Sequence, residues 1–389
     1  MSVHTLAAIA ESMPVATDVR VGGDDRKVRF VVDLSRKIDL AVFTLADPYR
    51  VVVDLPQVSF QFAPKAGDQG RGLVKAFRYG LVMRGGSRIV LDTKGPVKVD
   101  KAFVLDAAQG QPARLVLDLS ATDRASFMHN MALTARQARV AAVRSELPSA
   151  HDSGDPRPLI VLDPGHGGID TGAVAPTGQN EKDIVLTFAL LLRDKLEHTG
   201  KYRVAMTRSD DTFIPLGERV RFARAQQASL FVSIHADFIP RREGQAEGAS
   251  VYTLSDKASD EEAAKLADVE NRSDAIAGVD LSSEPDDVAN ILIDLAQRET
   301  KTFSTQFART LVGELKATIR MHQHPLKSAG FKVLKDPDVP SVLLELGYVS
   351  TKADLVNLES PQWRSRTADS LVQAIDTFFA PRLAGAGAR

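Results

Sequence analysis

The stretch LIVLDPGHGGIDTGA, residues 159–173, decides the fold of the longer part of this chain. It opens with a short apolar run that ends in aspartate, which is typical of a strand buried on both faces of a parallel sheet. A glycine-rich loop follows, and apolar residues then recur at helical spacing over about 181–198. Strands that alternate with helices predict an α/β domain with a mostly parallel sheet flanked by helices. Further strands are expected at 202–208, 230–236, 249–254 and 341–347, with helices near 216–228, 302–320 and 364–379.

A repeat of strands precedes this domain. The segments are RFVVD at 29–33, RVVVD at 50–54, RIVLD at 88–92 and RLVLD at 114–118. β-Branched runs closed by Asp and turn residues predict a small antiparallel all-β sandwich of two related halves over residues 17–120. Residues 1–150 carry 21 Lys and Arg against 15 Asp and Glu, a net charge of +6. That charge suits an anionic polymer, although a solvated sheet face explains any individual Arg equally well.

The remaining segments complete the expected domain organisation. Residues 121–158 lose the strand pattern and are expected to be a linker with room for one helix, and residues 159–389 form the α/β domain. The total length of 389 residues fits two to three domains at about 150 residues each. The first residues lack the basic start of a secretory signal, which leaves a cytoplasmic location or a signal that precedes this sequence as alternatives.

Composition excludes several classes of protein. Lys and Arg number 49 against 50 Asp and Glu, so the chain lacks the positive field of a dedicated nucleic-acid binder. Every apolar run is too short to span a membrane. Cysteine is absent, so a metal site would have to use His, Asp and Glu.

Three such residues lie where a parallel sheet concentrates function. His166 follows the first strand, Glu181 opens the next helix and His235 ends a later strand. Two imidazoles and one carboxylate, with a position left for water, form a catalytic zinc set. A lone histidine at a strand end is more often a hydrogen-bonded loop residue, so the metal interpretation requires the three ends to converge. A phosphate-loop interpretation of DPGHGG is disfavoured because no GK[ST] follows.

Glu345 is a carboxylate inside the apolar strand SVLLELG, residues 341–347. Burial of an unpaired carboxylate costs several kcal/mol, so it either pairs with an arginine or points to the solvated end of the strand. The functional alternative is a general base whose pKa is raised by its apolar flanks.

Five ordered motifs across residues 159–379 carry a resemblance to a known family. LDPGHGGIDTGA, NEKDIVL, TRSDDTFIPLGERVRFA, SIHAD and AGFKVLKDPDVPSVLLELGYVS resemble the zinc-dependent N-acetylmuramoyl-L-alanine amidases of the type 3 family. The strand repeats resemble the AMIN domain that precedes such catalytic domains in proteobacterial cell-division amidases.

The resemblance implies hydrolysis of the amide that joins the lactyl group of N-acetylmuramic acid to L-alanine of the peptidoglycan stem peptide. It implies one Zn²⁺ per chain on His166, Glu181 and His235, with Glu345 as the catalytic glutamate. It also implies a periplasmic monomer that splits septal wall during cell division, targeted to peptidoglycan by residues 17–120.

Residues 257–300 are expected to be an insertion in the catalytic domain. They hold 12 Asp and Glu against 4 Lys and Arg, and a solvated acidic excursion is one interpretation. The segment EEAAKLADVENRSDAIAG has helical composition, and Ser283 as N-cap with Pro285 in the first turn predicts a second helix. The apolar stripe of that second helix comprises Val288, Ile291, Leu292 and Leu295.

For this insertion the resemblance implies a helix that plugs the zinc site until a LytM-type activator protein binds. Glu270 resembles the plugging glutamate, with Asp268 and Asp274 as neighbouring acidic alternatives. The apolar stripe is then expected to be the surface that contacts the activator.

Two other functions compete with the amidase. One is a different zinc peptidase that acts on the stem peptide, against which the order of the motifs argues. The other is a catalytically silent wall-binding regulator, which is disfavoured because the three ligands and Glu345 are all present.

Overall fold

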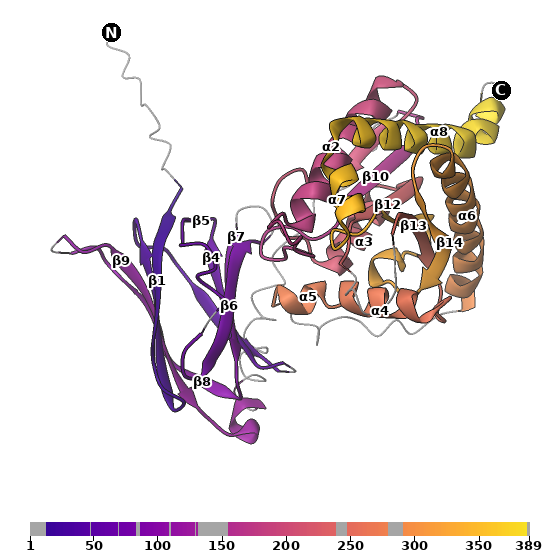
Figure 1. Ribbon diagram of the computed structural model, residues 1–389. Helices are drawn as coiled ribbons and strands as arrows, with labels where there is room; N and C mark the ends of the chain where they lie inside the picture. Colours follow the sequence, from indigo (N-terminus) through magenta and orange to yellow (C-terminus); the bar gives the residue numbers. More distant parts are fainter. Residues whose placement is uncertain are drawn as a thin grey trace, which may run out of the picture. The chain divides into compact units, whose positions relative to one another are not determined.

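The computed structural model describes residues 13–46, 48–68, 70–82, 86–108, 110–128, 130, 155–238, 247–278 and 291–386, with no side chains described for 291–299 and 381–386. The chain forms two compact units, residues 1–145 and 146–389 (Figure 1). The helix predicted within the linker, around residues 131–144, lies outside the described residues.

The first unit is the predicted all-β sandwich, which confirms this half of the fold class. One sheet has the order β5-β1-β2-β9-β8 and the other the order β3-β4-β7-β6. Neighbouring strands are antiparallel except for a short parallel contact between β1 and β5. The strands are β1 (Val15–Gly23), β2 (Lys27–Leu34), β3 (Ala41–Leu45), β4 (Arg50–Pro56), β5 (Ser59–Phe60), β6 (Val74–Leu81), β7 (Gly86–Thr93), β8 (Val97–Leu105) and β9 (Ala113–Ala121).

The four repeats pair with one another at the centre of each sheet. β2 lies beside β9, and β4 lies beside β7, so the first Arg of one repeat stands opposite the last Asp of its partner. Arg29 Nε lies 2.7 Å from Asp118 Oδ1, and Arg88 Nε lies 2.5 Å from Asp54 Oδ1. Ion pairs at the surface of a sheet contribute about 0–1 kcal/mol each, so stability comes mainly from the apolar core between the sheets. Charged residues of the repeats thus form ion pairs between neighbouring strands.

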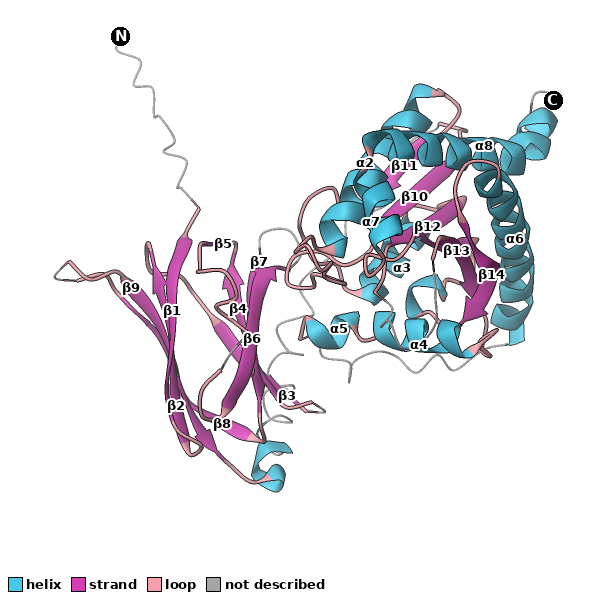
Figure 2. Ribbon diagram, in the orientation of Figure 1, coloured by secondary structure: helices cyan, strands magenta, loops and turns pink. Residues whose placement is uncertain are grey.

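The second unit is built on one six-stranded sheet of order β11-β10-β12-β15-β13-β14 (Figure 2). The first four strands are parallel, whereas β13 runs antiparallel to β15 and β14 runs parallel to β13. This confirms the predicted mostly parallel sheet. The strands are β10 (Leu159–Pro164), β11 (Arg203–Met206), β12 (Leu230–His235), β13 (Ala249–Leu254), β14 (Met321–Ala329) and β15 (Ser341–Glu345).

Helices cover both faces of this sheet. Alternate residues of β10 face opposite ways, so Ile160 packs in the core of one face and Val161 in the core of the other. The first face carries α2 (Glu181–His198), α6 (Ile291–Lys316), α7 (Lys352–Glu359) and α8 (Pro361–Ala386). The second face carries α3 (Leu216–Ala225), α4 (Glu261–Glu270) and the short 3₁₀ helix η2 (Lys332–Leu334). None of the helices in the described residues is long and apolar enough to cross a bilayer.

Several elements differ from the sequence prediction. β14 and α7 were not expected. The prediction of a separate second helix in the insertion is also wrong for the residues from Ile291 onward. Ile291 and Leu295 lie in α6, the same helix as the segment expected near 302–320. No Gly or Pro occurs from Ile291 up to Gly313, so no helix-breaking residue separates the two predicted helical segments. Leu292 lies in the same helix, and Val288, the remaining residue of the predicted stripe, lies outside the described residues.

Candidate metal centre

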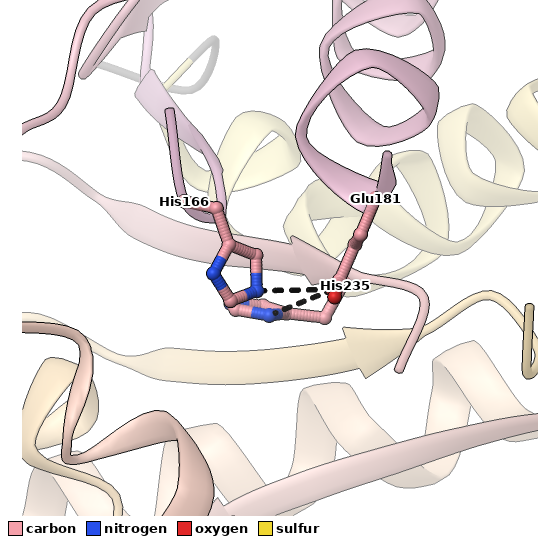
Figure 3. Close-up of side chains that lie close together, drawn as sticks. All are labelled: His166, Glu181 and His235. Carbon is pink, nitrogen blue, oxygen red and sulfur yellow. Dashed lines mark ion pairs between the residues drawn. The ribbon is translucent and has the colours of Figure 1, made fainter. Parts of the chain in front are cut away.

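The three side chains that the sequence pattern singled out lie together at one edge of the sheet (Figure 3). His166 follows β10, His235 is the last residue of β12, and Glu181 is the first residue of α2. Glu181 Oε1 lies 3.2 Å from His166 Nε2 and 3.3 Å from His235 Nδ1. All three candidate ligand atoms lie within 4.8 Å of one another, so a single ion could contact them all.

Glycines allow this close approach. His166 itself has a left-handed backbone, with φ of 58°. A Cβ added at Gly165 would overlap the ring of His235, and one at Gly172 would lie 2.7 Å from Glu181 Oε2. These glycines are therefore required where the backbone passes under the candidate ligands.

Hydrogen bonds fix the orientation of two of the candidate ligands. Asp170 Oδ2 lies 3.0 Å from His166 Nδ1, which turns Nε2 toward Glu181. Glu181 accepts backbone hydrogen bonds from Ala173 at 2.9 Å and from Ala236 at 2.8 Å. The role of Asp170 was not predicted from the sequence, although its position four residues after His166 in HGGID was an available signal.

The polar atoms at this edge fit a metal ion. His166 Nε2 and His235 Nδ1 are buried and make no hydrogen bond in the described part of the chain. Buried polar groups are rarely left unbonded, and these two face a fully buried carboxylate. Two imidazole nitrogens and one carboxylate oxygen are a donor set that zinc prefers.

Glu345 lies beside this set. It is the last residue of β15 and pairs in register with His235 on β12. Its side chain is fully buried, so the solvated alternative is wrong, and Oε1 has no hydrogen-bond partner among the described residues. Oε2 accepts a hydrogen bond from the backbone N–H of Asp237 at 3.1 Å. Burial and repulsion from Glu181 raise the pKa of the carboxyl groups of Glu345 and Asp237 well above their usual range.

A carboxylate from the predicted insertion reaches the same ring nitrogens. Glu270, the last residue of α4, places Oε2 at 3.1 Å from His235 Nδ1 and 3.6 Å from His166 Nε2. Of the acidic alternatives, Asp274 instead accepts a hydrogen bond from the backbone of Leu216 at 2.8 Å. Asp268 lines a pocket on the flank of α4.

The residues after Glu270 bind the insertion to the rest of the domain. Asn271 donates to the carbonyl of Gly330 at 2.9 Å and accepts from the backbone of Lys332 at 2.8 Å. Ser273, in the short helix α5 (Ser273–Ile276), donates to Asp170 Oδ2 at 2.5 Å. Asp170 therefore contacts both the insertion and the imidazole of His166.

Comparisons with known proteins show the family to which this chain belongs. Residues 160–377 match the family model for N-acetylmuramoyl-L-alanine amidase, and residues 18–119 match the AMIN domain. The amidase AmiC of Escherichia coli O6:H1 strain CFT073 is 34% identical over 98% of this chain and 93% of its own length. The amidase AmiC of Neisseria meningitidis serogroup B is 32% identical over 96% of this chain and 92% of its own length.

Among solved structures, the amidase AmiC2 of Nostoc punctiforme is 25% identical, with a TM-score of 0.41 over 57% of this chain and 97% of that one. More than half of the chain matches the amidase family model, and relatives above 30% identity span nearly its whole length. The chain therefore belongs to the N-acetylmuramoyl-L-alanine amidase family of hydrolases.

Proposed function

We propose that this hydrolase uses one zinc ion, held by His166, Glu181 and His235, to cleave the amide between the lactyl group of N-acetylmuramic acid and L-alanine of the stem peptide. The observation that carries the proposal is a pair of buried imidazole nitrogens beside a buried Glu345. They lie 3.2 and 3.3 Å from Glu181 Oε1 and make no hydrogen bond among the described residues. Its setting would be the periplasm, where a monomer splits the septal wall during cell division.

The chain's own contribution to the reaction is proton transfer by Glu345. Zinc bound to the three ligands would supply Lewis acidity, which activates water and polarises the scissile carbonyl. The backbone N–H of Asp237 binds Glu345 Oε2, and Oε1 has no hydrogen-bond partner in the part of the chain that the structure describes, so Oε1 can accept a proton from water. Its raised pKa makes Glu345 a stronger base for that proton. The protonated carboxyl group can then pass the proton to the departing amide nitrogen, which must be protonated to leave.

The products of sacculus digestion test the bond that is cleaved. Digestion is expected to release free stem peptides that begin with L-alanine and to leave glycan strands without peptide. Mass spectrometry of the soluble products separates this result from the alternatives. Fragments that still carry L-alanine on muramic acid would indicate a peptidase that acts within the stem peptide, and undigested sacculi would favour a silent wall-binding protein.

Autoinhibition by the insertion is the second part of the proposal. A catalytic zinc site needs an open coordination position, and Glu270 Oε2 lies close enough to both imidazoles to occupy it. Asn271 and Ser273 hold the end of α4 in this place through hydrogen bonds to the carbonyl of Gly330 and to Asp170. An activator must therefore favour a state in which α4 has left the site, because a ligand shifts an equilibrium only by its differential affinity.

Glu270→Ala is expected to raise basal activity without an activator. A gain of roughly tenfold corresponds to about 1.4 kcal/mol between the plugged and open states. Dye release from labelled sacculi measures the rate. Glu261→Ala is the matched control, because Glu261 lies on the same helix with its side chain 85% exposed. Equal basal rates for wild type and Glu270→Ala, with zinc retained in both, would contradict autoinhibition by this residue.

The activator is proposed to be a LytM-type protein that contacts the stripe of Val288, Ile291, Leu292 and Leu295. Three of these residues belong to the first turns of α6. Leu292→Lys should then leave basal activity low and prevent activation, whereas a passive stripe predicts normal activation in the same dye-release assay.

Cell-wall targeting is proposed for the β-sandwich, residues 17–120. This unit has its own apolar core between its two sheets, so it should fold alone. The isolated fragment is expected to sediment with purified sacculi and to show no hydrolysis. If all of the fragment stays in the supernatant, the unit is a spacer or a partner-binding domain.

A further inference from the structure

Two buried arginines lie beneath the candidate ligands and take no part in the chemistry proposed above. Arg208 belongs to TRSDD and Arg219 to GERV, and their residues are 3% and 1% exposed. A buried guanidinium is costly unless its donors are bonded, so the partners of these groups indicate what they do.

Arg219, on α3, bonds the loop that carries His166. Its Nη2 donates to the carbonyl of His166 at 2.7 Å, and its Nη1 donates to the carbonyl of Pro164 at 2.9 Å. Nη1 also lies 2.8 Å from the fully buried carboxylate of Asp163. Asp163 accepts in addition from Ser233, two residues before His235, at 2.7 Å. Arg219 is thus linked to the elements that hold both histidines.

Arg208 joins the same loop to α2. Its Nη2 atom donates to the carbonyl of Gly165 at 2.7 Å and to that of Lys182 at 2.9 Å. Gly165 immediately precedes His166, and Lys182 immediately follows Glu181. Nε donates to the carbonyl of Pro164 at 2.9 Å. A single guanidinium therefore sets the spacing between the backbones of two candidate ligands.

The loop needs such support. His166 has a positive φ, a conformation that is unfavourable for a residue with a Cβ and that persists only when its surroundings fix it. Three consecutive carbonyls, of residues 164 to 166, accept hydrogen bonds from the two guanidinium groups. Lysine has a single donor nitrogen and cannot reproduce this fork.

We propose that Arg208 and Arg219 are positioning residues that hold the backbones of His166 and Glu181 in the geometry required to bind the metal. The inference rests on the proposed zinc set. It assigns to the TRSDD and GERV motifs a role in metal affinity, separate from proton transfer by Glu345.

The test compares Arg208→Lys and Arg219→Lys with the wild-type full chain. Zinc affinity is measured by competition with a chromogenic chelator, and the visible spectrum of the Co²⁺-substituted protein reports the ligand geometry. Zinc affinity is expected to fall by about 10- to 100-fold, as for other groups that orient metal ligands, and the Co²⁺ spectrum should change. Arg221→Lys is the control, because Arg221 lies on α3 with its side chain 56% exposed and pairs with Glu218.

Failure of the metal set and failure of the positioning role give different results. Wild-type protein without stoichiometric zinc would contradict the proposed metal set itself. With zinc bound in the wild type, affinities within threefold of wild type in both Arg variants would overturn the positioning role. So would loss of the metal-free fold in both variants, judged by circular dichroism, because the arginines would then be structural only.

Discussion

Glu345→Gln is expected to lower the rate of dye release from labelled sacculi by about 100- to 10,000-fold, the usual contribution of general acid and base catalysis. Glutamine has nearly the same shape and can still accept the hydrogen bond that Asp237 donates to Oε2. It cannot accept a proton from water or deliver one to the leaving nitrogen. Zinc content and thermal stability should therefore stay close to wild type while turnover is lost.

The matched control for this change is Glu359→Gln, at the exposed end of α7. It should retain the wild-type rate. Activity within a few fold of wild type in Glu345→Gln would remove Glu345 from the mechanism, whatever its burial.

His166→Ala and His235→Ala should each abolish stoichiometric zinc and, with it, activity. Each substitution removes one of three candidate ligands and leaves only one imidazole beside the buried carboxylates of Glu181 and Glu270. Elemental analysis of the purified proteins measures the zinc. His198→Ala is the control, because His198 is exposed at the end of α2 and bonds its own helix.

Retention of full zinc by both of these variants would show that the ligand set is wrong. Loss of zinc from only one would indicate that another nearby carboxylate, such as Glu270, can complete the site.

The parts of this molecule that sequence could predict are those with local patterns. The RxVxD repeats predicted a sandwich because β-branched runs and turn residues act within a few positions. The apolar run before DPGHGG predicted a strand of a parallel sheet, and the rule that sites lie at carboxyl strand ends placed His166 and His235 at one edge. β14 was not predicted because its sequence, HQHPLK, is polar and contains Pro325. Proline is tolerated there because β14 is an edge strand of the sheet.

Other features depend on contacts between distant segments. No local pattern states that Ser273 meets Asp170, about one hundred residues earlier, or that Arg219 meets the carbonyl of His166. The position of Glu270 depends likewise on how α4 packs across the second face of the sheet. These residues lie in motifs that the sequence shows, but their contact partners are known only from the tertiary structure.

X-ray diffraction from crystals of the full chain at the zinc absorption edge tests the central claim most directly. The account predicts one anomalous peak, bonded to His166 Nε2, His235 Nδ1 and the Glu181 carboxylate, with Glu270 Oε2 as the fourth ligand. A zinc-loaded crystal with no peak between these atoms, or with its peak at another cluster, would contradict it.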